Sequence, residues 1–260
     1  MDWRLGVAGS PIAHSLSPEL HAAGLNMAGL RGSSRRYEIP EAAADTLREL
    51  LGVSVDAMSI TMPLKAVAAR LCDRLDGRAT SLGVVNSVLW RDGELHGAAT
   101  DGPGFIDALR GEFAVSVQNM HAVVLGAGGA AAAIVDSLVD EGVHSISLHG
   151  RSSANVARIA ARHPQVVDHT VLFRPVDLIV NTTPAEGRDQ GAAVMQGVTR
   201  DTIALDITYD PRTSPWLALH ADLGCRSRNG LAMLAYTVTR QMNWWWDVEL
   251  DGAQLLKAIS

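Results

Sequence analysis

Cysteine is scarce in this sequence. Only Cys72 and Cys225 occur, far apart and outside any CxxC pattern, so both are interpreted as reduced packing residues and not as a disulfide or a metal clip. The nine histidines are scattered, and none forms an HxxxH or HExxH pair with a carboxylate close by. The sequence therefore predicts no metal site.

A basic surface and a long apolar run are also missing. Acidic residues outnumber basic ones, 28 to 22, and lysine and arginine do not cluster, which speaks against nucleic acid as a partner. No stretch approaches the roughly 20 uncharged apolar residues that span a bilayer, and the first residues lack a cationic segment followed by an apolar run. We expect no membrane partner and a cytoplasmic location.

Hydrophobic residues are plentiful, at 47% of 260 positions, which is enough for one large domain or two modest ones. In the first hundred residues, strand-like runs alternate with helical stretches, and this alternation favours parallel strands joined by crossover helices. The strands are expected at 5–8, 36–39 and 57–60, and the helices at 18–28 and 42–51.

A hairpin is expected after these elements. Val84–Trp90 and Leu95–Ala98 are strand-like, and the Asp92-Gly93 pair between them favours a tight turn. The pattern predicts an antiparallel edge of the sheet at this hairpin.

A second α/β unit follows the hairpin. Its expected elements are a strand at 122–125, a glycine turn at 126–129, a helix to about 141, and strands at 145–149, 176–180 and 202–205. Because this unit is then complete, the helices expected at 230–247 and 251–259 should pack back against the first domain. The boundaries inferred from these positions are 1–101 plus 235–260 for one domain and 102–234 for the other.

The tract Trp244-Trp245-Trp246 falls on the longer of these terminal helices. Consecutive residues of a helix face different sides, so the three rings cannot form one stacking surface. We expect at least one ring in the core and another at a neighbouring domain or subunit, and we assign the tract no catalytic role.

The glycine turn has the spacing of a dinucleotide site. A buried strand leads into Gly126, Gly128 and Gly129, with Ala131 in the third position of a GxGxx(G/A) pattern. The first glycine permits the tight turn and the second lets the backbone approach a pyrophosphate. A helix entry that needs only small residues is the plainer interpretation, but the strand before and the helix after favour a cofactor.

The end of the next strand carries no acidic side chain, although an NAD-preferring site usually has one there for the ribose 2′-hydroxyl. Arg151 offers a guanidinium instead, and Ser152 and Ser153 offer hydroxyls, which suit a 2′-phosphate. A solvated surface arginine is the alternative. The position of Arg151 directly after the strand favours NADP.

Several polar residues in the first domain could carry chemistry, yet each has an ordinary explanation. Ser15 and Ser17 could bind an anion, although Ser17 followed by Pro18 also suits a helix N-cap with proline in the first helical position. Lys65 follows a strand and opens a helix, where it could reach over the strand ends, but most lysines lie on the surface. Asp101 is explained equally well as a helix cap.

The combination is more specific than its parts. GSPIAHSLSP, SITMPLK, GVVNS, ATDGPGF, VLGAGGAA, LIVNTTP, DITYDP and NGLAML occur in the order and approximate spacing of the shikimate dehydrogenase family, which the sequence resembles over nearly its whole length. The resemblance implies an α/β fold with an N-terminal mixed-sheet substrate domain and a Rossmann-type NADP-binding domain flanking a cleft. It also implies reversible NADP-dependent reduction of 3-dehydroshikimate to shikimate in chorismate and aromatic amino acid biosynthesis, by a monomer or a homodimer.

The resemblance also assigns roles position by position. The catalytic lysine and its aspartate partner correspond to Lys65 and Asp101. The carboxylate-binding serines correspond to Ser15 and Ser17, and the other substrate positions to Ser59, Thr61, Asn86, Tyr209 and Thr237. The NADP(H) positions correspond to Gly126, Ala127, Gly128, Gly129, Ala130, Arg151, Ser152, Ile207 and Gly230. These roles are chemically consistent, because hydride transfer to a ketone builds negative charge on oxygen that an ammonium can stabilise and protonate.

Some positions depart from the family pattern, mainly where substrate is recognised. Thr237 stands where a glutamine is common, and Ser59 and Ala99 stand where asparagines are common. In the nucleotide half, Ala132 lacks the usual basic side chain and Gly150 replaces an asparagine. Each unmade polar contact at a desolvated site can cost ~1–3 kcal/mol, so specificity could differ from that of the family.

Three alternatives therefore stay open. The substrate could be quinate, an aminoshikimate or another cyclohexane carboxylate, unless water or the hydroxyls of Ser59 and Thr237 replace the missing amides. The chain could instead be a catalytically silent NADP-binding protein, although retention of Lys65 and Asp101 speaks against this. A folate-linked dehydrogenase on the same two-domain plan is disfavoured by the paired serines and the ATDGPGF segment.

Overall fold

A computed structural model describes residues 2–167, 175–183 and 197–259. The chain forms two compact units, Met1–Phe105 with Leu234–Ser260, and Ile106–Met233. We refer to them as the first and the second unit. Each contains one six-stranded sheet with helices packed on it, and the predicted α/β class is confirmed.

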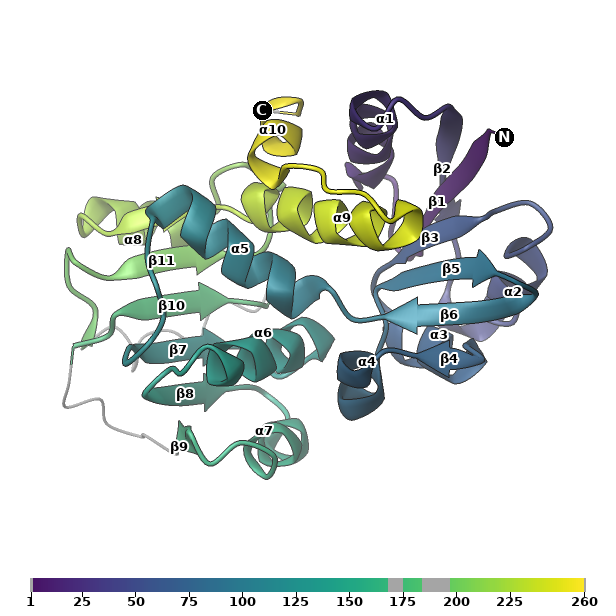
Figure 1. The fold of residues 1–260 in the computed structure, drawn as a ribbon. Helices are drawn as coiled ribbons and strands as arrows, with labels where there is room; N and C mark the ends of the chain where they lie inside the picture. Colours follow the sequence, from purple (N-terminus) through teal and green to yellow (C-terminus); the bar gives the residue numbers. More distant parts are fainter. Residues whose placement is uncertain (1, 168–174, 184–196, 260) are drawn as a thin grey trace. The chain divides into compact units, whose positions relative to one another are not determined.

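The sheet of the first unit is mixed, with strand order β2-β1-β3-β5-β6-β4 (Figure 1). Its strands are β1 (Trp3–Gly9), β2 (Gly32–Glu38), β3 (Ala57–Ile60), β4 (Arg74–Leu75), β5 (Ser87–Arg91) and β6 (Glu94–Ala98). The β1 strand pairs in parallel with β2 and β3, as the alternating pattern predicts. The β5–β6 hairpin is antiparallel, and its turn residues Asp92 and Gly93 both have positive φ, which is the conformation that a tight hairpin turn requires.

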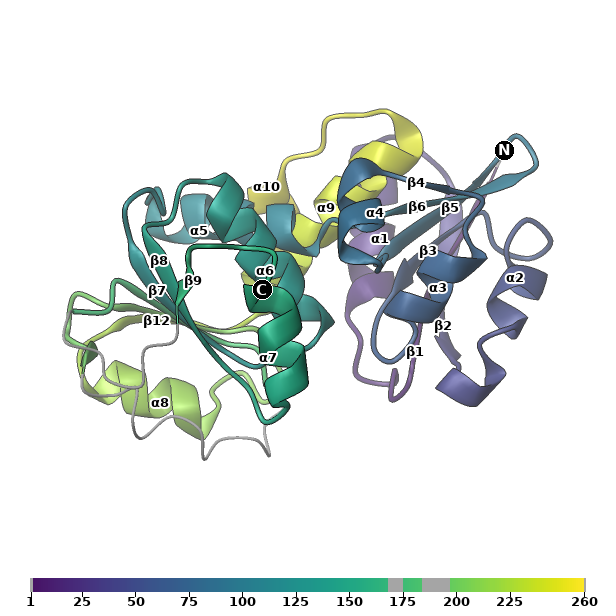
Figure 2. The same ribbon diagram turned by 90° about the horizontal axis from the view of Figure 1, so that it is seen from below.

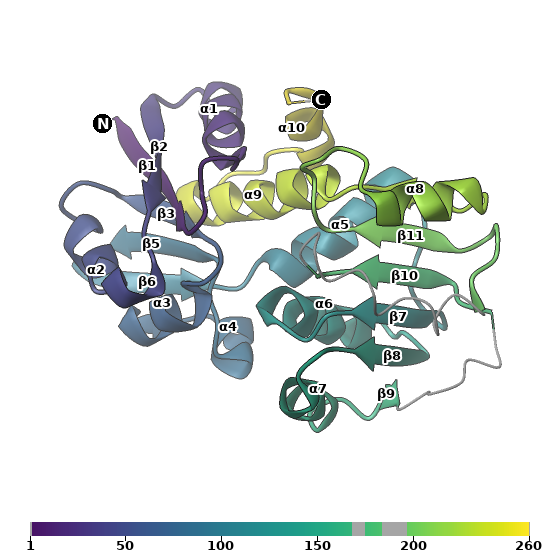
Figure 3. The ribbon, with the colours of Figure 1, turned by 180° about the vertical axis from the view of Figure 1, so that it is seen from behind.

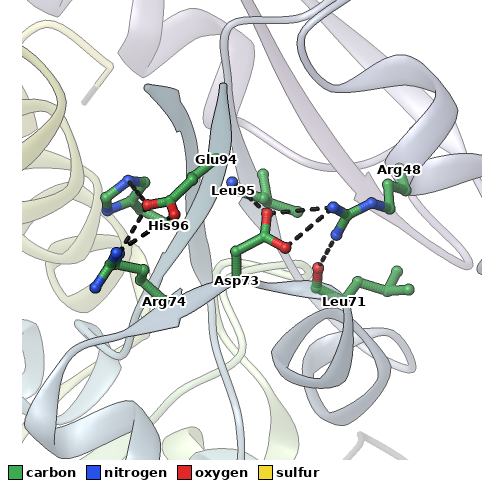
Figure 4. Close-up of polar contacts among 7 residues, drawn as sticks. All are labelled: Arg48, Leu71, Asp73, Arg74, Glu94, Leu95 and His96. Atoms are coloured by element: carbon green, nitrogen blue, oxygen red, sulfur yellow. Dashed lines mark hydrogen bonds and ion pairs between the residues drawn. The ribbon is translucent and has the colours of Figure 1, made fainter. Parts of the chain in front are cut away.

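The hairpin was expected to form the edge of this sheet, and this prediction is wrong. The two-residue strand β4 pairs in parallel with β6 and lies outside it. Side chains hold this short strand in place (Figure 4): Asp73 accepts hydrogen bonds from the Leu95 amide at 2.8 Å and from Arg48 at 3.0 Å, and Arg74 pairs with Glu94 at 2.7 Å. The Leu95 amide and then Arg48 lower the pKa of Asp73. Two residues are too few to show a strand pattern in sequence.

Helices cover both faces of the first sheet. They are α1 (Ser17–Met27), the 3-10 helix η1 (Glu41–Ala43), α2 (Thr46–Leu50), α3 (Lys65–Leu71), α4 (Gly77–Leu82), α9 (Leu231–Trp246) and α10 (Gly252–Lys257). Figure 2 shows α1, α9 and α10 on one face and α2 and α3 on the other. The single helix expected at 42–51 is divided into η1 and α2.

The terminal helices pack on the core of the first unit, as predicted. Leu5 and Leu89 of the sheet share one buried cluster with Val238, Met242 and Leu255 of α9 and α10. The Met242 side chain of α9 packs against the α1 backbone, since a Cβ added at Gly24 would lie 2.4 Å from the Met242 sulfur. Burial of these apolar side chains is the main favourable contribution to the free energy with which the C-terminal helices pack on the N-terminal sheet.

Of the tryptophan tract, Trp245 lies in this core and its indole N–H donates to Ser87 Oγ at 2.8 Å. Trp244 and Trp246 are partly buried and pack around the same cluster. The expectation that one ring lies in the core is confirmed.

The sheet of the second unit is parallel throughout, with strand order β12-β11-β10-β7-β8-β9. Its strands are β7 (His121–Leu125), β8 (Ser145–His149), β9 (Val166–Val167), β10 (Leu178–Asn181), β11 (Ile203–Asp206) and β12 (Arg226–Arg228). Numbered from β7 within the unit, this is the order 3-2-1-4-5-6 of a Rossmann sheet, and it reverses between β7 and β10. Figure 3 shows these two strands side by side.

The helices in and beside the second unit are α5 (Asp101–Phe113), α6 (Gly129–Asp140), α7 (Ser153–Ala160) and α8 (Pro215–Asp222). The α6 and α8 helices lie on opposite faces of the sheet (Figure 2), as in a doubly wound fold. Across the described ranges, no helix is both long and apolar enough to cross a membrane. The same ranges contain no group of three histidine, cysteine or carboxylate side chains that could hold a metal ion.

Candidate active site and nucleotide site

A lysine and an aspartate meet in the first unit at the starts of two helices. Lys65 is the first residue of α3, directly after the β3 strand and its turn, and Asp101 is the first residue of α5, directly after β6. Lys65 Nζ donates to Asp101 Oδ2 at 2.5 Å, and the two side chains are 18% and 15% exposed. This charge-assisted hydrogen bond is shielded from most solvent yet still reachable by a ligand.

Asn86 fixes the other oxygen of that aspartate. Its side-chain amide donates to Asp101 Oδ1 at 2.8 Å and to Thr100 Oγ1 at 3.0 Å, while its Oδ1 accepts from the Thr100 amide at 2.7 Å. Asn86 is buried, and both of its amide N–H groups are used inside the protein. One oxygen of the aspartate therefore accepts from the Asn86 amide and the other from the Lys65 ammonium. These two hydrogen bonds fix the plane of the carboxylate before any ligand binds.

The paired serines lie on the loop between β1 and α1, and both are buried. Ser15 Oγ lies 3.2 Å from Ser17 Oγ, and the guanidinium of Arg36 donates to the Ser15 carbonyl at 2.8 Å. The interpretation of Ser17 as an N-cap is wrong: Leu16 occupies the cap position of α1 and no side chain caps the helix. The Ser17 hydroxyl is turned toward Ser15 instead, so two hydroxyls lie side by side.

The remaining predicted substrate positions of the first unit differ in their surroundings. Thr61 follows β3 and is partly exposed, near the end of the neighbouring parallel strand at Gly9. Ser59 is buried, with its hydroxyl bonded to His21 Nε2 at 3.1 Å and to the side chain of Gln241. Thr237 on α9 is 5% exposed, and its hydroxyl has no hydrogen-bond partner among the described residues. It faces Gly104, where an added Cβ would lie 2.3 Å from Thr237 Oγ1.

The glycine turn of the second unit joins β7 to α6. Gly126 has φ of 113°, and a Cβ there would lie 2.1 Å from Thr182 Oγ1, so the fold itself requires this glycine. Gly128 is the N-cap of α6, and no side chain caps the helix there. A Cβ added at Gly128 or Gly129 would meet no described atom within 4 Å. Small residues at these two positions therefore leave open space beside helix amides, which is the environment that a phosphate requires.

The end of β8 is adjacent to this turn. A Cβ at Gly150 would lie 2.7 Å from Ala127 Cβ, so the strand end and the glycine turn approach closely at this glycine. Arg151 is exposed, and Ser152 caps α7 by accepting from the Asn155 amide at 3.3 Å. Ala132 is buried on α6. Of the positions compared with the family, Arg151 is therefore the one that can present a cation to a 2′-phosphate.

The other predicted cofactor and substrate positions of the second unit follow β11 and β12 or lie on α6. Ile207 directly follows the strand, and its carbonyl oxygen would lie 1.9 Å from a Cβ placed on Gly230, so these two backbones touch. Ala130 lies in the first turn of α6, and Tyr209 is partly exposed. The contact between the Ile207 carbonyl and Gly230 is sufficient to require a glycine at position 230.

Sequence reasoning missed two residues of the first unit that the structure connects to its polar centre. His21 on α1 and Gln241 on α9 are both fully or almost fully buried and both bond Ser59. Gln241 lies one helical turn after Thr237, so the 3.6-residue period places both on one face of α9. That spacing was the signal available in the sequence.

A lysine–aspartate pair on a mixed α/β sheet, together with a Rossmann sheet that has an open glycine turn, defines a two-domain dehydrogenase. The pattern of the shikimate dehydrogenase substrate binding domain matches residues 7–88. The chain is 34% identical over 242 residues to the shikimate dehydrogenase (NADP(+)) of Roseobacter denitrificans, covering 89% of this chain and 87% of that one. The chain belongs to the shikimate dehydrogenase family, and the resemblance seen in its motifs is confirmed.

Solved structures support the same assignment. Shikimate dehydrogenase from Aquifex aeolicus superposes with a TM-score of 0.87 at 28% identity, covering 99% of this chain and 97% of that one. Shikimate 5-dehydrogenase from Thermus thermophilus in complex with NADP(H) and shikimate superposes with a TM-score of 0.86 at 29% identity, covering 98% of both chains. The likeness therefore extends over both units.

Proposed function

We propose that this chain is an NADP-dependent shikimate dehydrogenase that interconverts 3-dehydroshikimate and shikimate. The observation that carries the proposal is the Lys65–Asp101 hydrogen bond, held by Asn86, in a chain whose relatives over nearly its full length are NADP-dependent shikimate dehydrogenases. A binding module would need neither the ammonium nor the carboxylate.

In the proposed mechanism, Lys65 handles the proton. NADPH, when bound, supplies the hydride to the carbonyl carbon of the ketone. As negative charge builds on the carbonyl oxygen, the Lys65 ammonium stabilises it and gives up a proton to it, which completes the alcohol. Asp101, fixed through Oδ1 by Asn86, holds Lys65 through Oδ2 and so keeps the ammonium in register with the ring hydroxyl. In the oxidative direction, the neutral amine of Lys65 takes the hydroxyl proton and becomes the ammonium.

The residues of the second unit fit the cofactor. We assign the pyrophosphate to the open space at Gly128 and Gly129, next to the uncapped N-terminus of α6. We assign the 2′-phosphate to Arg151, whose guanidinium can form paired charge-assisted hydrogen bonds. Ile207 and Gly230 would border the nicotinamide.

We assign the substrate carboxylate to Ser15 and Ser17, because two adjacent hydroxyls on a fixed loop can both donate to one carboxylate. Thr61 would contact a ring hydroxyl, while Asn86, whose amide groups are used inside the protein, would act by holding Asp101. These assignments extend the family's roles to matching positions of this chain.

A second candidate is the same hydride transfer on a related ring acid, such as quinate or an aminoshikimate. Two observations favour it over an unmodified pocket. The Ser59 hydroxyl is already bonded by His21 and Gln241, and the Thr237 hydroxyl faces Gly104. Neither hydroxyl is therefore placed to make the same hydrogen bonds as the amide that the family commonly has at that position.

The test is to follow nicotinamide absorbance with the purified protein on shikimate, quinate and an aminoshikimate, with NADP⁺ and NAD⁺ in separate series. The proposal predicts the highest kcat/KM for shikimate with NADP⁺. Higher kcat/KM on another ring acid would transfer the assignment to that substrate. Tight NADPH binding without turnover on any of them would identify a catalytically silent homologue.

A further inference from the structure

Behind the Lys65–Asp101 pair, a line of buried hydrogen bonds crosses the first unit from α1 to α9. Ser34 Oγ lies 2.8 Å from His21 Nδ1, and His21 Nε2 lies 3.1 Å from Ser59 Oγ. Ser59 donates to Gln241 Oε1, and Gln241 Nε2 donates to the Asn86 carbonyl at 2.9 Å. Gln241 is 2% exposed, and His21 is fully buried.

The direction of every hydrogen bond in this line follows from its last step. A carbonyl only accepts, so the NH₂ of Gln241 must face Asn86 and its oxygen must face Ser59. The Ser59 proton then points to Gln241, and the Ser59 oxygen accepts from a protonated His21 Nε2. His21 Nδ1 is left to accept from Ser34. Burial lowers the pKa of His21 to about 3, so one neutral tautomer persists at ordinary pH.

Asn86 connects this line to the reacting pair. Its carbonyl accepts from Gln241 and from the Ile60 amide at 2.8 Å, while its side chain donates to Asp101. One turn further along α9, the Trp245 indole donates to Ser87, the next residue. Helix α9 therefore binds the Asn86-Ser87 segment with two side chains.

We propose that Gln241 is a positioning residue for the reaction: by fixing Asn86 and Ser59, it sets the orientation of Asp101 and hence of Lys65. The proposal deepens the function proposed above and rests on it for its kinetic consequences. Gln241 contacts neither Lys65 nor Asp101. It binds the main-chain carbonyl of Asn86, and the side chain of Asn86 in turn binds Asp101. Misplacement of a catalytic group by about 1 Å can cost on the order of 10²-fold in rate.

The first experiment replaces Gln241 with methionine, which keeps the length of the side chain and removes both hydrogen bonds. We expect kcat for shikimate oxidation to fall by about tenfold or more, with the KM for NADP⁺ unchanged. Thr239→Val is the matched control, because Thr239 is buried on the same helix and its hydroxyl bonds the Ala235 carbonyl of that helix. The control should keep the parent kcat even if both variants melt at a lower temperature.

The second experiment separates positioning from packing by pH. In Gln241→Glu, the neutral acid can accept from Ser59 and donate to Asn86, whereas the carboxylate cannot donate. We expect the ratio of variant to parent kcat to approach one at low pH and to fall as the pH passes the pKa of the introduced carboxyl group, while the ratio for Gln241→Met stays flat. A flat ratio for the Gln241→Glu variant as well, or parent kcat for Gln241→Met, would overturn the proposal.

A third measurement does not depend on activity. With asparagine labelled by ¹⁵N, the exchange of the Asn86 side-chain NH₂ with water reports how firmly its two bonds are held. We expect exchange to be faster in Gln241→Met than in the parent by about tenfold or more, and unchanged in Thr239→Val. Unchanged exchange in Gln241→Met refutes the positioning role. If the parent protein failed to oxidise shikimate, the proposed function would fail while this measurement would still decide the role of Gln241.

Discussion

The two units of this protein build their sites in opposite ways. In the first unit, the candidate site consists of polar side chains that are buried and bonded to one another, with Asn86 between Asp101 and Gln241. In the second unit, the glycine turn of the candidate nucleotide site consists of backbone without side chains, at Gly126, Gly128 and Gly129. Substitutions that remove side-chain atoms should therefore damage the first site, whereas substitutions that add atoms should damage the glycine turn.

The difference follows from what each unit has to do. Proton transfer needs charged and amide groups at fixed distances, and buried polar groups stay in place when each one has a partner. A pyrophosphate needs close approach to main-chain N–H groups, which any side chain would obstruct. Four substitutions test the contrast, and their expected effects decrease from the first to the last.

Lys65→Ala removes the ammonium from the first site. Because proton transfer by a positioned side chain commonly contributes about 10²–10⁴-fold, we expect kcat for shikimate oxidation to fall by that amount, with KM for shikimate changed by about threefold or less. Steady-state kinetics with NADP⁺ would check this. Turnover equal to that of the parent would remove Lys65 from the mechanism.

Gly128→Ala adds one methyl group to the second site. No described atom lies within 4 Å of the new Cβ, so the fold should lose no more than about 1 kcal/mol, the usual range for a change at an N-cap. We expect the Kd for NADPH to rise by at least about tenfold, because the methyl would enter the space assigned to the pyrophosphate. Fluorescence titration with NADPH and urea unfolding would measure the two effects.

Two neighbouring glycines extend that test. Gly129→Ala adds a methyl to the same open space one residue further on, at a helical position where alanine is favoured, and should weaken NADPH binding without a loss of stability. Gly126→Ala should lower stability as well as affinity, because its Cβ would collide with Thr182 Oγ1. If Gly128→Ala and the parent bound NADPH with equal affinity, the glycine turn would be explained as a helix start that needs only small residues.

Arg151→Ala removes the cation assigned to the 2′-phosphate. A hydrogen bond to a charged group contributes about 1.5–3 kcal/mol, so we expect the KM for NADP⁺ to rise by roughly tenfold or more. The KM for NAD⁺, which lacks the phosphate, should stay the same. The measurement is the ratio of kcat/KM for NADP⁺ to kcat/KM for NAD⁺. An unchanged ratio would mean that Arg151 is a solvated surface residue without a role in cofactor choice.

His21→Gln has the smallest effect at neutral pH, because it keeps an N–H donor near the place of His21 Nε2. Burial lowers the pKa of His21 from its ordinary 6.5 to about 3, so below pH 6.5 the unfolded chain takes up this proton first. The parent should therefore lose stability as the pH falls from 6.5 toward 3, by at most about 1.4 kcal/mol per unit from this group. Urea unfolding at several pH values should show a shallower loss for the variant, and parallel losses would contradict the neutral buried ring.

Much of the fold could be predicted because its elements have strong local signals. The β3 and β8 strands occur at the residues expected, and the Asp92-Gly93 pair makes the tight turn that its positive φ angles favour. Order and spacing of the motifs also predicted the family. The short strand β4 could not be predicted, because its position depends on bonds from Arg48 and Glu94, which are distant in sequence.

The candidate site was less predictable than the fold. The Lys65–Asp101 contact was inferred through the resemblance, since 36 residues separate the two and no local pattern joins them. Gln241 was missed because a glutamine on a helix usually lies on the surface, and only its contacts with Ser59 and Asn86 show otherwise. The glycine at 150 was visible as a departure, but its reason depends on the approach of Ala127.

We assign proton chemistry to the first unit and cofactor binding to the second, and titration of NADPH into the parent, Lys65→Ala and Gly128→Ala proteins in parallel decides whether this division holds. We expect one Kd for the parent and Lys65→Ala, and a Kd at least about tenfold higher for Gly128→Ala. Equal weakening in both variants, or weakening in Lys65→Ala alone, would show that the two roles are not divided in this way.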